Sequence, residues 1–108
     1  MSKLLTEELK KTLPKLRAQD GSKDPIVYMK FFFPASNWTW YVTEGEVTDD
    51  DDFLFFGYVI GFEREWGYFG MSELEGVNVH GIRVARDLSF DPKPLSYCGL
   101  WSSQQQEN

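Results

Sequence analysis

The chain has 108 residues, of which 42% are hydrophobic and 17% aromatic, and its formal net charge is −6. This length fits one domain with a single core, and the aromatic content excludes a disordered chain, so we expect one domain over residues 1–100 and a polar flexible tail over 101–108. Eleven basic against seventeen acidic residues argue against binding of duplex DNA by phosphate neutralisation.

The expected compartment is the cytoplasm. Cys98 is the only cysteine and cannot form an internal disulfide, which is typical of a reducing environment. No apolar run approaches the ~20 residues that cross a bilayer, and the N-terminus has no signal-peptide pattern, so no membrane partner is expected.

The N-terminus predicts a helix. A hydroxyl cap at Thr6 followed by Glu7 and Glu8 marks its start, and Pro14 predicts its end near Thr12. Four leucines spaced by four, four and three residues are predicted to share one helical face: Leu5, Leu9, Leu13 and Leu16. A turn-rich link over 18–24 follows.

Two strands come next. Residues 26–33 are β-branched and aromatic and end at Pro34, and residues 38–43 alternate cleanly. The short link between them predicts a hairpin. In its second strand Trp38, Trp40 and Val42 point to one face, and Thr39, Tyr41 and Thr43 to the other.

An exposed acidic loop is predicted over residues 44–52, before a third strand over 53–62 that is apolar on both faces, as central strands are. Gly57 and Gly61 in this strand indicate a bulge or a large ring packed against them, with the tryptophans as candidates. A turn over 63–65 leads to a fourth strand over 66–69.

The remaining segments predict a short capped helix over 72–75, a loop over 76–81, an irregular segment or edge strand over 82–90, and an extended segment over 91–95. The predicted fold class is α+β: an N-terminal helix packed on an antiparallel meander of about four strands, with a short second helix.

Several strings resemble a small bacterial family, the domain of unknown function 2958 family, over residues 4 to about 96. They are Leu4-Leu5-Thr6-Glu7-Glu8-Leu9, Lys30-Phe31-Phe32, Ser36-Asn37-Trp38-Thr39-Trp40-Tyr41, Phe53-Leu54-Phe55-Phe56-Gly57, Gly67-Tyr68-Phe69, Ser72-Glu73-Leu74-Glu75, Arg86-Asp87-Leu88 and Pro92-Lys93-Pro94-Leu95. The resemblance implies a prokaryotic setting on plasmids, conjugative elements or phages, hence a bacterial host cell. It implies no activity, cofactor or residue role. The aspartate run and the glutamine-rich tail depart from the family pattern.

The charge is concentrated in residues 37–81, which hold one basic and ten acidic side chains, a charge of −9. Such a surface attracts a partner protein with a basic surface. The candidate partner-binding residues are the acids and two aromatics of this region: Asp49, Asp50, Asp51, Asp52, Glu44, Glu46, Trp38 and Tyr41. The simpler interpretation of the aspartates is that they keep a hairpin loop soluble.

No metal site, cofactor or catalytic residue is predicted. The aspartate run lacks the ligand order of a calcium loop. Glu63, Glu65, Glu73 and Glu75 have structural explanations in a turn and a helix start. A small hydrolase would require His80 near a carboxylate, or Cys98 in a pocket, and stays an alternative.

A second alternative is an accessory binder of single-stranded nucleic acid, using Lys30, Phe32 and Tyr28 on an exposed sheet face. It requires exposed aromatic rings beside Lys30. The preferred hypothesis is a non-enzymatic acidic protein-interaction domain of a mobile element or phage, whose sharpest form is an inhibitor of a host defence or DNA-binding protein.

Overall fold

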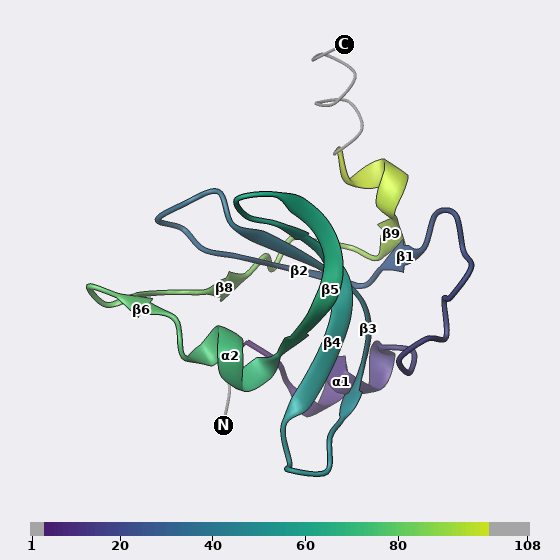
Figure 1. The fold of residues 1–108 in the computed structure, drawn as a ribbon, viewed down its shortest axis with the longest axis horizontal. Helices are drawn as coiled ribbons and strands as arrows, with labels where there is room; N and C mark the ends of the chain where they lie inside the picture. Colours follow the sequence, from purple (N-terminus) through teal and green to yellow (C-terminus); the bar gives the residue numbers. More distant parts are fainter. Residues whose placement is uncertain (1–3, 100–108) are drawn as a thin grey trace.

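The fold is built on one antiparallel sheet. The computed structural model describes residues 4–99, and its main sheet has the strand order β5-β4-β3-β2-β8. The elements are α1 Glu7–Thr12, β1 Ile26–Val27, β2 Met29–Phe32, β3 Thr39–Val47, β4 Phe53–Ile60, β5 Arg64–Gly70, α2 Met71–Glu75, β6 Asn78–Val79, β7 Ile82–Arg83, β8 Ala85–Arg86, β9 Lys93–Pro94 and the 3₁₀ helix η1 Leu95–Cys98. Figure 1 shows β3, β4 and β5 side by side through the centre.

The predicted antiparallel sheet with two short helices is confirmed. The sheet has five strands instead of about four, because β8 pairs with the outer side of β2. The predicted tail over 101–108 lies outside the described residues, and the domain boundary at residue 100 stays a prediction. Among residues 4–99, no helix is long and apolar enough to cross a membrane.

Helix α1 begins and ends where its caps predict. The Thr6 hydroxyl accepts a hydrogen bond from the Leu9 backbone N–H at 3.1 Å, and the chain turns extended at Leu13, just before Pro14. The prediction that four leucines share one helical face is wrong, because α1 has six residues and includes only Leu9. Leu5 and Leu13 flank the helix, and both are buried in the core.

The hairpin of β2 and β3 is confirmed, with Phe31 opposite Trp40 and Lys30 opposite Tyr41. The predicted strand over 26–33 is divided at Tyr28. Before this point, β1 leaves the main sheet and pairs with β9 instead. As a result, Val27 packs in one buried cluster, whereas Met29 and Phe31 pack in another.

The predicted acidic loop is too long. Strand β3 continues to Val47 and includes Glu44 and Glu46, so only residues 48–52 connect it to β4. A register shift between Val42 and Glu44 marks a β-bulge. The strand continues because its acids find backbone donors in the segment after α1, which sequence reasoning on charge repulsion did not foresee.

The two glycines of the β4 region have the two explanations that were predicted. A Cβ at Gly57 would collide with the backbone carbonyl of Tyr41, beside the bulge. A Cβ at Gly61 would collide with the Trp38 indole. Both positions therefore require glycine because a neighbour approaches too closely for any side chain.

Two connections differ from prediction. The turn between β4 and β5 lies at 61–63, where the Gly61 N–H donates to the Glu63 carbonyl at 2.9 Å, and Arg64 already belongs to β5. The predicted loop over 76–81 instead contains β6, which pairs with β7 in a small hairpin. Its turn uses left-handed backbone at His80 and Gly81, with φ of 54° and 85°, as a two-residue hairpin turn requires.

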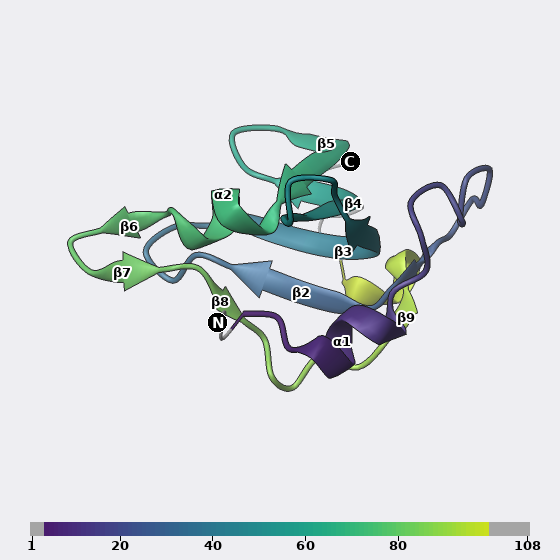
Figure 2. The same cartoon turned by 90° about the horizontal axis from the view of Figure 1, so that it is seen from below.

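Side chains pack on both faces of the sheet. The larger cluster contains Leu5, Leu13, Met29, Phe31, Trp40, Val42, Phe53, Phe55, Phe69, Met71, Leu74 and Val84. The smaller cluster, on the other face, contains Val27, Tyr41, Tyr58 and Leu95. Figure 2 shows the β6–β7 hairpin at one end of the molecule and β9 with η1 at the other, where η1 contributes Leu95 to the smaller cluster.

Candidate partner-binding groove

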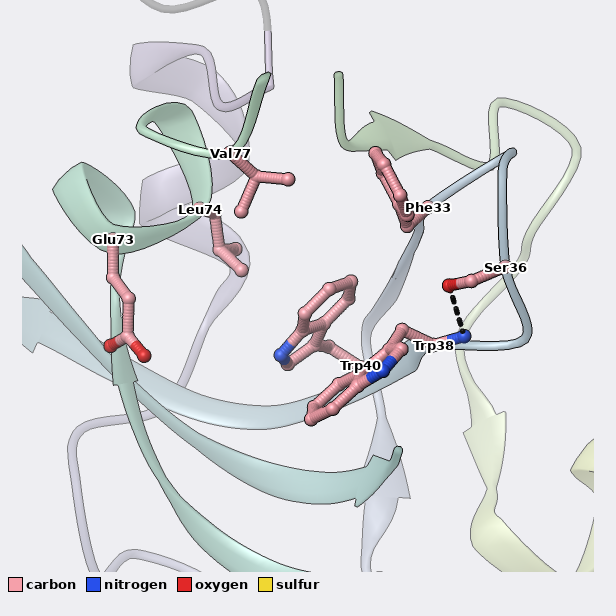
Figure 3. A pocket seen from close by; sticks show the side chains of 7 residues that line it. All are labelled: Phe33, Ser36, Trp38, Trp40, Glu73, Leu74 and Val77. Carbon is pink, nitrogen blue, oxygen red and sulfur yellow. Dashed lines mark hydrogen bonds between the residues drawn. The ribbon is translucent and has the colours of Figure 1, made fainter. Parts of the chain in front are cut away.

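A cavity of about 380 Å³ opens between the start of β3 and helix α2. Figure 3 shows the indoles of Trp38 and Trp40 on one side of it and Leu74 and Val77 on the other, with Glu73 at the edge. The lining is mainly apolar. This is the composition of pockets that bind ligands through burial, with a few polar groups setting orientation.

A second cavity of about 310 Å³ adjoins the first and reaches strand β5. It shares Trp38, Trp40 and Glu73 with the first cavity and adds Glu65 and Phe69 from β5. The two cavities share these walls, and together we call them the tryptophan groove.

The wall of the tryptophan groove is held in place by neighbouring groups. The Trp38 ring lies 5.8 Å from the Trp40 ring at 32°, and the Phe62 ring meets Trp38 edge-on at 5.5 Å. The Trp38 backbone N–H donates to the Ser36 hydroxyl at 3.1 Å. Gly61 leaves room for the Trp38 indole, which packs directly against its backbone.

Trp40 presents an unused donor to the groove. Its side chain is almost fully buried, with the residue 8% exposed, and its indole nitrogen points toward the side where Glu73 lies (Figure 3). Within residues 4–99, this nitrogen has no hydrogen-bond acceptor. None of the buried side-chain nitrogen and oxygen atoms of the described residues lacks a partner, so this indole N–H is open to the groove and can donate to water or to an oxygen of a bound molecule.

Two carboxylates border the same aromatic surface. Glu73 accepts a hydrogen bond from the Gly70 backbone N–H at 3.3 Å, which uses one of its oxygens in a capping interaction. Glu65 is exposed on β5, and its carboxylate has no hydrogen bond or ion pair to any other described residue. Aromatic faces beside carboxylates attract ammonium and guanidinium groups.

Of the two predicted aromatic contacts, Trp38 lies in the groove and is partly exposed. Tyr41 is instead 6% exposed and packs with Tyr58 and Leu95 in the smaller cluster, so it is not available as a surface contact. Burial raises the pKa of the Tyr41 phenol above its usual value. Trp38 packs against the larger cluster and Tyr41 belongs to the smaller one, so the two rings lie on opposite faces of the sheet.

Glu44, which was also predicted to contact a partner, is not accessible on the surface. Glu44 is 2% exposed, and its carboxylate accepts backbone N–H groups of Arg17 at 2.7 Å and Gln19 at 2.8 Å. Glu46 is exposed and accepts the Leu16 N–H at 3.0 Å. Both acids fasten the segment after α1 to strand β3.

The aspartate run divides into two parts. Asp49, Asp50 and Asp51 are exposed on the β3–β4 connection. Asp52 instead joins this connection to α2: its carboxylate accepts the Phe53 N–H at 2.8 Å and the Ser72 N–H at 3.1 Å, and the Ser72 hydroxyl donates to it at 2.7 Å. The hydrogen bonds from Ser72 and Phe53 lower the pKa of Asp52.

We expect Asp52→Asn to lower the free energy of unfolding by about 1 kcal/mol near pH 7, because it weakens charge-assisted hydrogen bonds at the start of α2. Because the folded pKa is lowered, this contribution is present above the unfolded pKa of ~3.9 and is lost as pH falls through the folded value. Urea unfolding at several pH values measures the effect. Asp49→Asn is the matched control, and equal effects of both variants would contradict the assignment.

The residues proposed for single-stranded nucleic acid are not freely available. Tyr28, Lys30 and Phe32 are partly buried, and the Lys30 ammonium lies 3.9 Å from the Asp87 carboxylate. It also lies 5.7 Å from the centre of the buried Tyr41 ring. The rings of Tyr28 and Phe32 beside Lys30 are therefore only partly exposed, and Lys30 already has an anionic neighbour.

His80 and Cys98 do not form a nucleophile–base pair. His80 lies in the turn of the β6–β7 hairpin and Cys98 in η1, at opposite ends of the molecule (Figures 1 and 2). Burial raises the pKa of the Cys98 thiol, which is the reverse of nucleophile activation. Residues 4–99 hold no group of three or more His, Cys, Asp and Glu placed to bind a metal.

Sequence reasoning missed Glu65 and Glu73 as members of the groove. The spacing of Trp38, Trp40 and Gly61 predicted their common side of the sheet, but Glu73 follows the last strand of the meander. Only the way the chain folds back through α2 brings Glu73 beside Trp38 and Trp40.

Fold and groove together define a small α+β domain with an aromatic groove bordered by carboxylates. A family model described as "Protein of unknown function (DUF2958)" matches residues 4–104, and the chain belongs to this family. The family indicates no enzyme class. Neither the curated proteins nor the solved structures contain a match.

Proposed function

We propose that the chain is a non-enzymatic protein-binding domain that takes a basic side chain of a partner protein into the tryptophan groove. The observation that carries the proposal is the juxtaposition of Trp38, Trp40, Glu65 and Glu73 along this groove. A lysine or arginine side chain there would contact the aromatic faces and the two carboxylates. A backbone carbonyl of the same partner segment would accept a hydrogen bond from the Trp40 indole N–H.

The expected strength of this interaction is moderate. A cation on an aromatic face contributes about 0.5 to 2 kcal/mol, and an exposed ion pair about 0.2 to 1 kcal/mol. The charge of −9 over residues 37–81 adds long-range attraction, which raises the association rate and falls with salt. A narrower form of the proposal, suggested by the family resemblance, is that the partner is a bacterial DNA-binding or defence protein inhibited through its basic surface.

The test uses peptides of stated composition. Oligolysine, oligoarginine and trimethyllysine peptides, with an oligoglutamate control, are titrated against the domain while tryptophan fluorescence is recorded. We expect the basic peptides to bind and the double variant Glu65→Gln/Glu73→Gln to weaken binding roughly tenfold. Gln at position 73 retains the capping interaction, so the fold should be preserved.

The matched control is Asp49→Asn/Asp50→Asn, which removes the same two charges from the exposed loop. If this control weakened binding as much as the groove variant, the groove would not be the site. Capture from bacterial lysate with nuclease treatment, followed by cross-linking of the recovered protein to the groove, would identify the partner. Recovery of single-stranded nucleic acid alone would support the alternative instead.

A further inference from the structure

We infer that the partner supplies an extended segment that pairs with the free edge of β5 and so adds a strand to the sheet. This inference rests on the proposed function, because the same segment would bring a basic side chain to the tryptophan groove. Strand β5 is at one end of the order β5-β4-β3-β2-β8 and has seven residues, Arg64–Gly70.

The hydrogen-bond pattern shows which groups point outward from β5. The Thr43 hydroxyl donates to the Phe56 carbonyl, so Phe56 faces β3. At the turn, the Gly61 N–H donates to the Glu63 carbonyl, so the main-chain groups of Gly61 and Glu63 face each other across the β4–β5 hairpin. In an antiparallel strand, the main-chain groups of successive residues point alternately to one neighbouring strand and to the other. The N–H and C=O groups of Glu65, Gly67 and Phe69 therefore face β4.

The main-chain groups of Arg64, Trp66 and Tyr68 therefore face away from the sheet. Among residues 4–99, none of these groups has a hydrogen-bond partner. Other chains recognise such rows of unpaired donors and acceptors by strand addition.

The β5 edge is protected only at its start, by the charged residues Arg64 and Glu65. Natural edges carry lysine, proline or a bulge that blocks pairing, whereas β5 reads Arg-Glu-Trp-Gly-Tyr-Phe-Gly and pairs with β4 without a shift in register. Trp66 and Tyr68 are 41% and 57% exposed, and Gly67 has open space around it. At Gly67 a neighbouring backbone would therefore meet no side chain of this residue.

Charge indicates what kind of segment would pair there. The edge strand begins with Arg64 and continues with Glu65, and the second cavity of the groove, which also has Glu73 in its lining, reaches β5 through Glu65 and Phe69. A strand beside β5 with alternating basic residues would place every second side chain on the groove face and leave the others over Trp66 and Tyr68. A second copy of this acidic chain fits less well, since two surfaces of equal negative charge would meet.

The test follows amide hydrogen exchange in the full chain, with an acetylated and amidated octapeptide of alternating lysine and threonine as the probe. We expect the Trp66 and Tyr68 amides to exchange at least tenfold more slowly at saturating peptide. The Gly67 amide, already paired with β4, is an internal control that should not change. Unchanged exchange at Trp66 and Tyr68 with bound peptide would overturn strand addition and leave the proposed function standing.

A pair of variants provides a second readout. Tyr68→Pro removes the outward N–H, and Tyr68→Thr removes the ring but keeps that donor and suits a strand. We expect Tyr68→Pro to bind the peptide roughly tenfold more weakly than Tyr68→Thr, with thermal unfolding confirming that both fold. Equal affinities would contradict the inference.

The experiments distinguish failure of strand addition at β5 from failure of binding in the tryptophan groove. Loss of binding only in Glu65→Gln/Glu73→Gln would limit the interaction to side chains and overturn strand addition. Absence of any peptide binding would count against both the proposed function and this inference. Sedimentation showing a dimer with protected Trp66 and Tyr68 amides would make a second copy the occupant and overturn the partner strand.

Discussion

Glu44→Ala should lower the free energy of unfolding by about 2 to 3 kcal/mol. The carboxylate is 2% exposed and accepts the backbone N–H groups of Arg17 and Gln19 at 2.7 and 2.8 Å. Alanine leaves both donors without an acceptor and leaves a void beside β3. Urea unfolding monitored by tryptophan fluorescence measures the loss.

Glu46→Ala is the matched control, because Glu46 lies two residues further along β3 and also accepts one backbone N–H, that of Leu16 at 3.0 Å. Since Glu46 is exposed, water can replace its carboxylate, and we expect a loss of less than about 1 kcal/mol. A Glu44 effect no larger than that of Glu46 would mean that the segment after α1 contributes little to stability.

Gly57→Ala should lower the free energy of unfolding by about 3 kcal/mol or more. A methyl group at this position would collide with the Tyr41 carbonyl, which belongs to the backbone of the central strand and cannot turn aside as a side chain can. The β3–β4 pairing would have to separate at the bulge. Thermal unfolding and the amide exchange of β3 would report this directly.

The cross-strand partner of Gly57 supplies the control. Gly67 lies opposite it on β5, and a Cβ there meets nothing within 4 Å. Gly67→Ala should be neutral or stabilise by about 0.5 kcal/mol, because alanine loses less backbone entropy on folding than glycine. If the two substitutions had equal effects, steric conflict at Tyr41 would not be the reason for glycine at position 57.

Local signals predicted much of the fold. The Thr6 cap and Pro14 fixed the bounds of α1 because both act within a single turn of chain. Alternation placed Trp40 and Tyr41 on opposite faces of β3, because successive side chains of a strand must point apart. Gly57 and Gly61 predicted close neighbours for the same local reason, the absence of a Cβ.

The errors occurred where a distant segment changed the outcome. Charge repulsion predicted an exposed loop from residue 44, but the donors of Arg17 and Gln19 neutralise that tendency and extend β3 to Val47. Tyr41 was expected to be accessible, but Leu95 from η1 covers it. In both cases the deciding contact joins residues more than twenty positions apart.

By itself, the sequence determined the α+β class, the hairpins, the acidic character of residues 37–81 and the need for glycine at two positions, since these depend on neighbours along the chain. The tertiary structure alone decided that Glu65 and Glu73 meet Trp38 and Trp40, and that β5 has a free edge. Strand order and the path through α2 fix these relations. They arise from packing between segments that the sequence separates, which periodicity and composition do not encode.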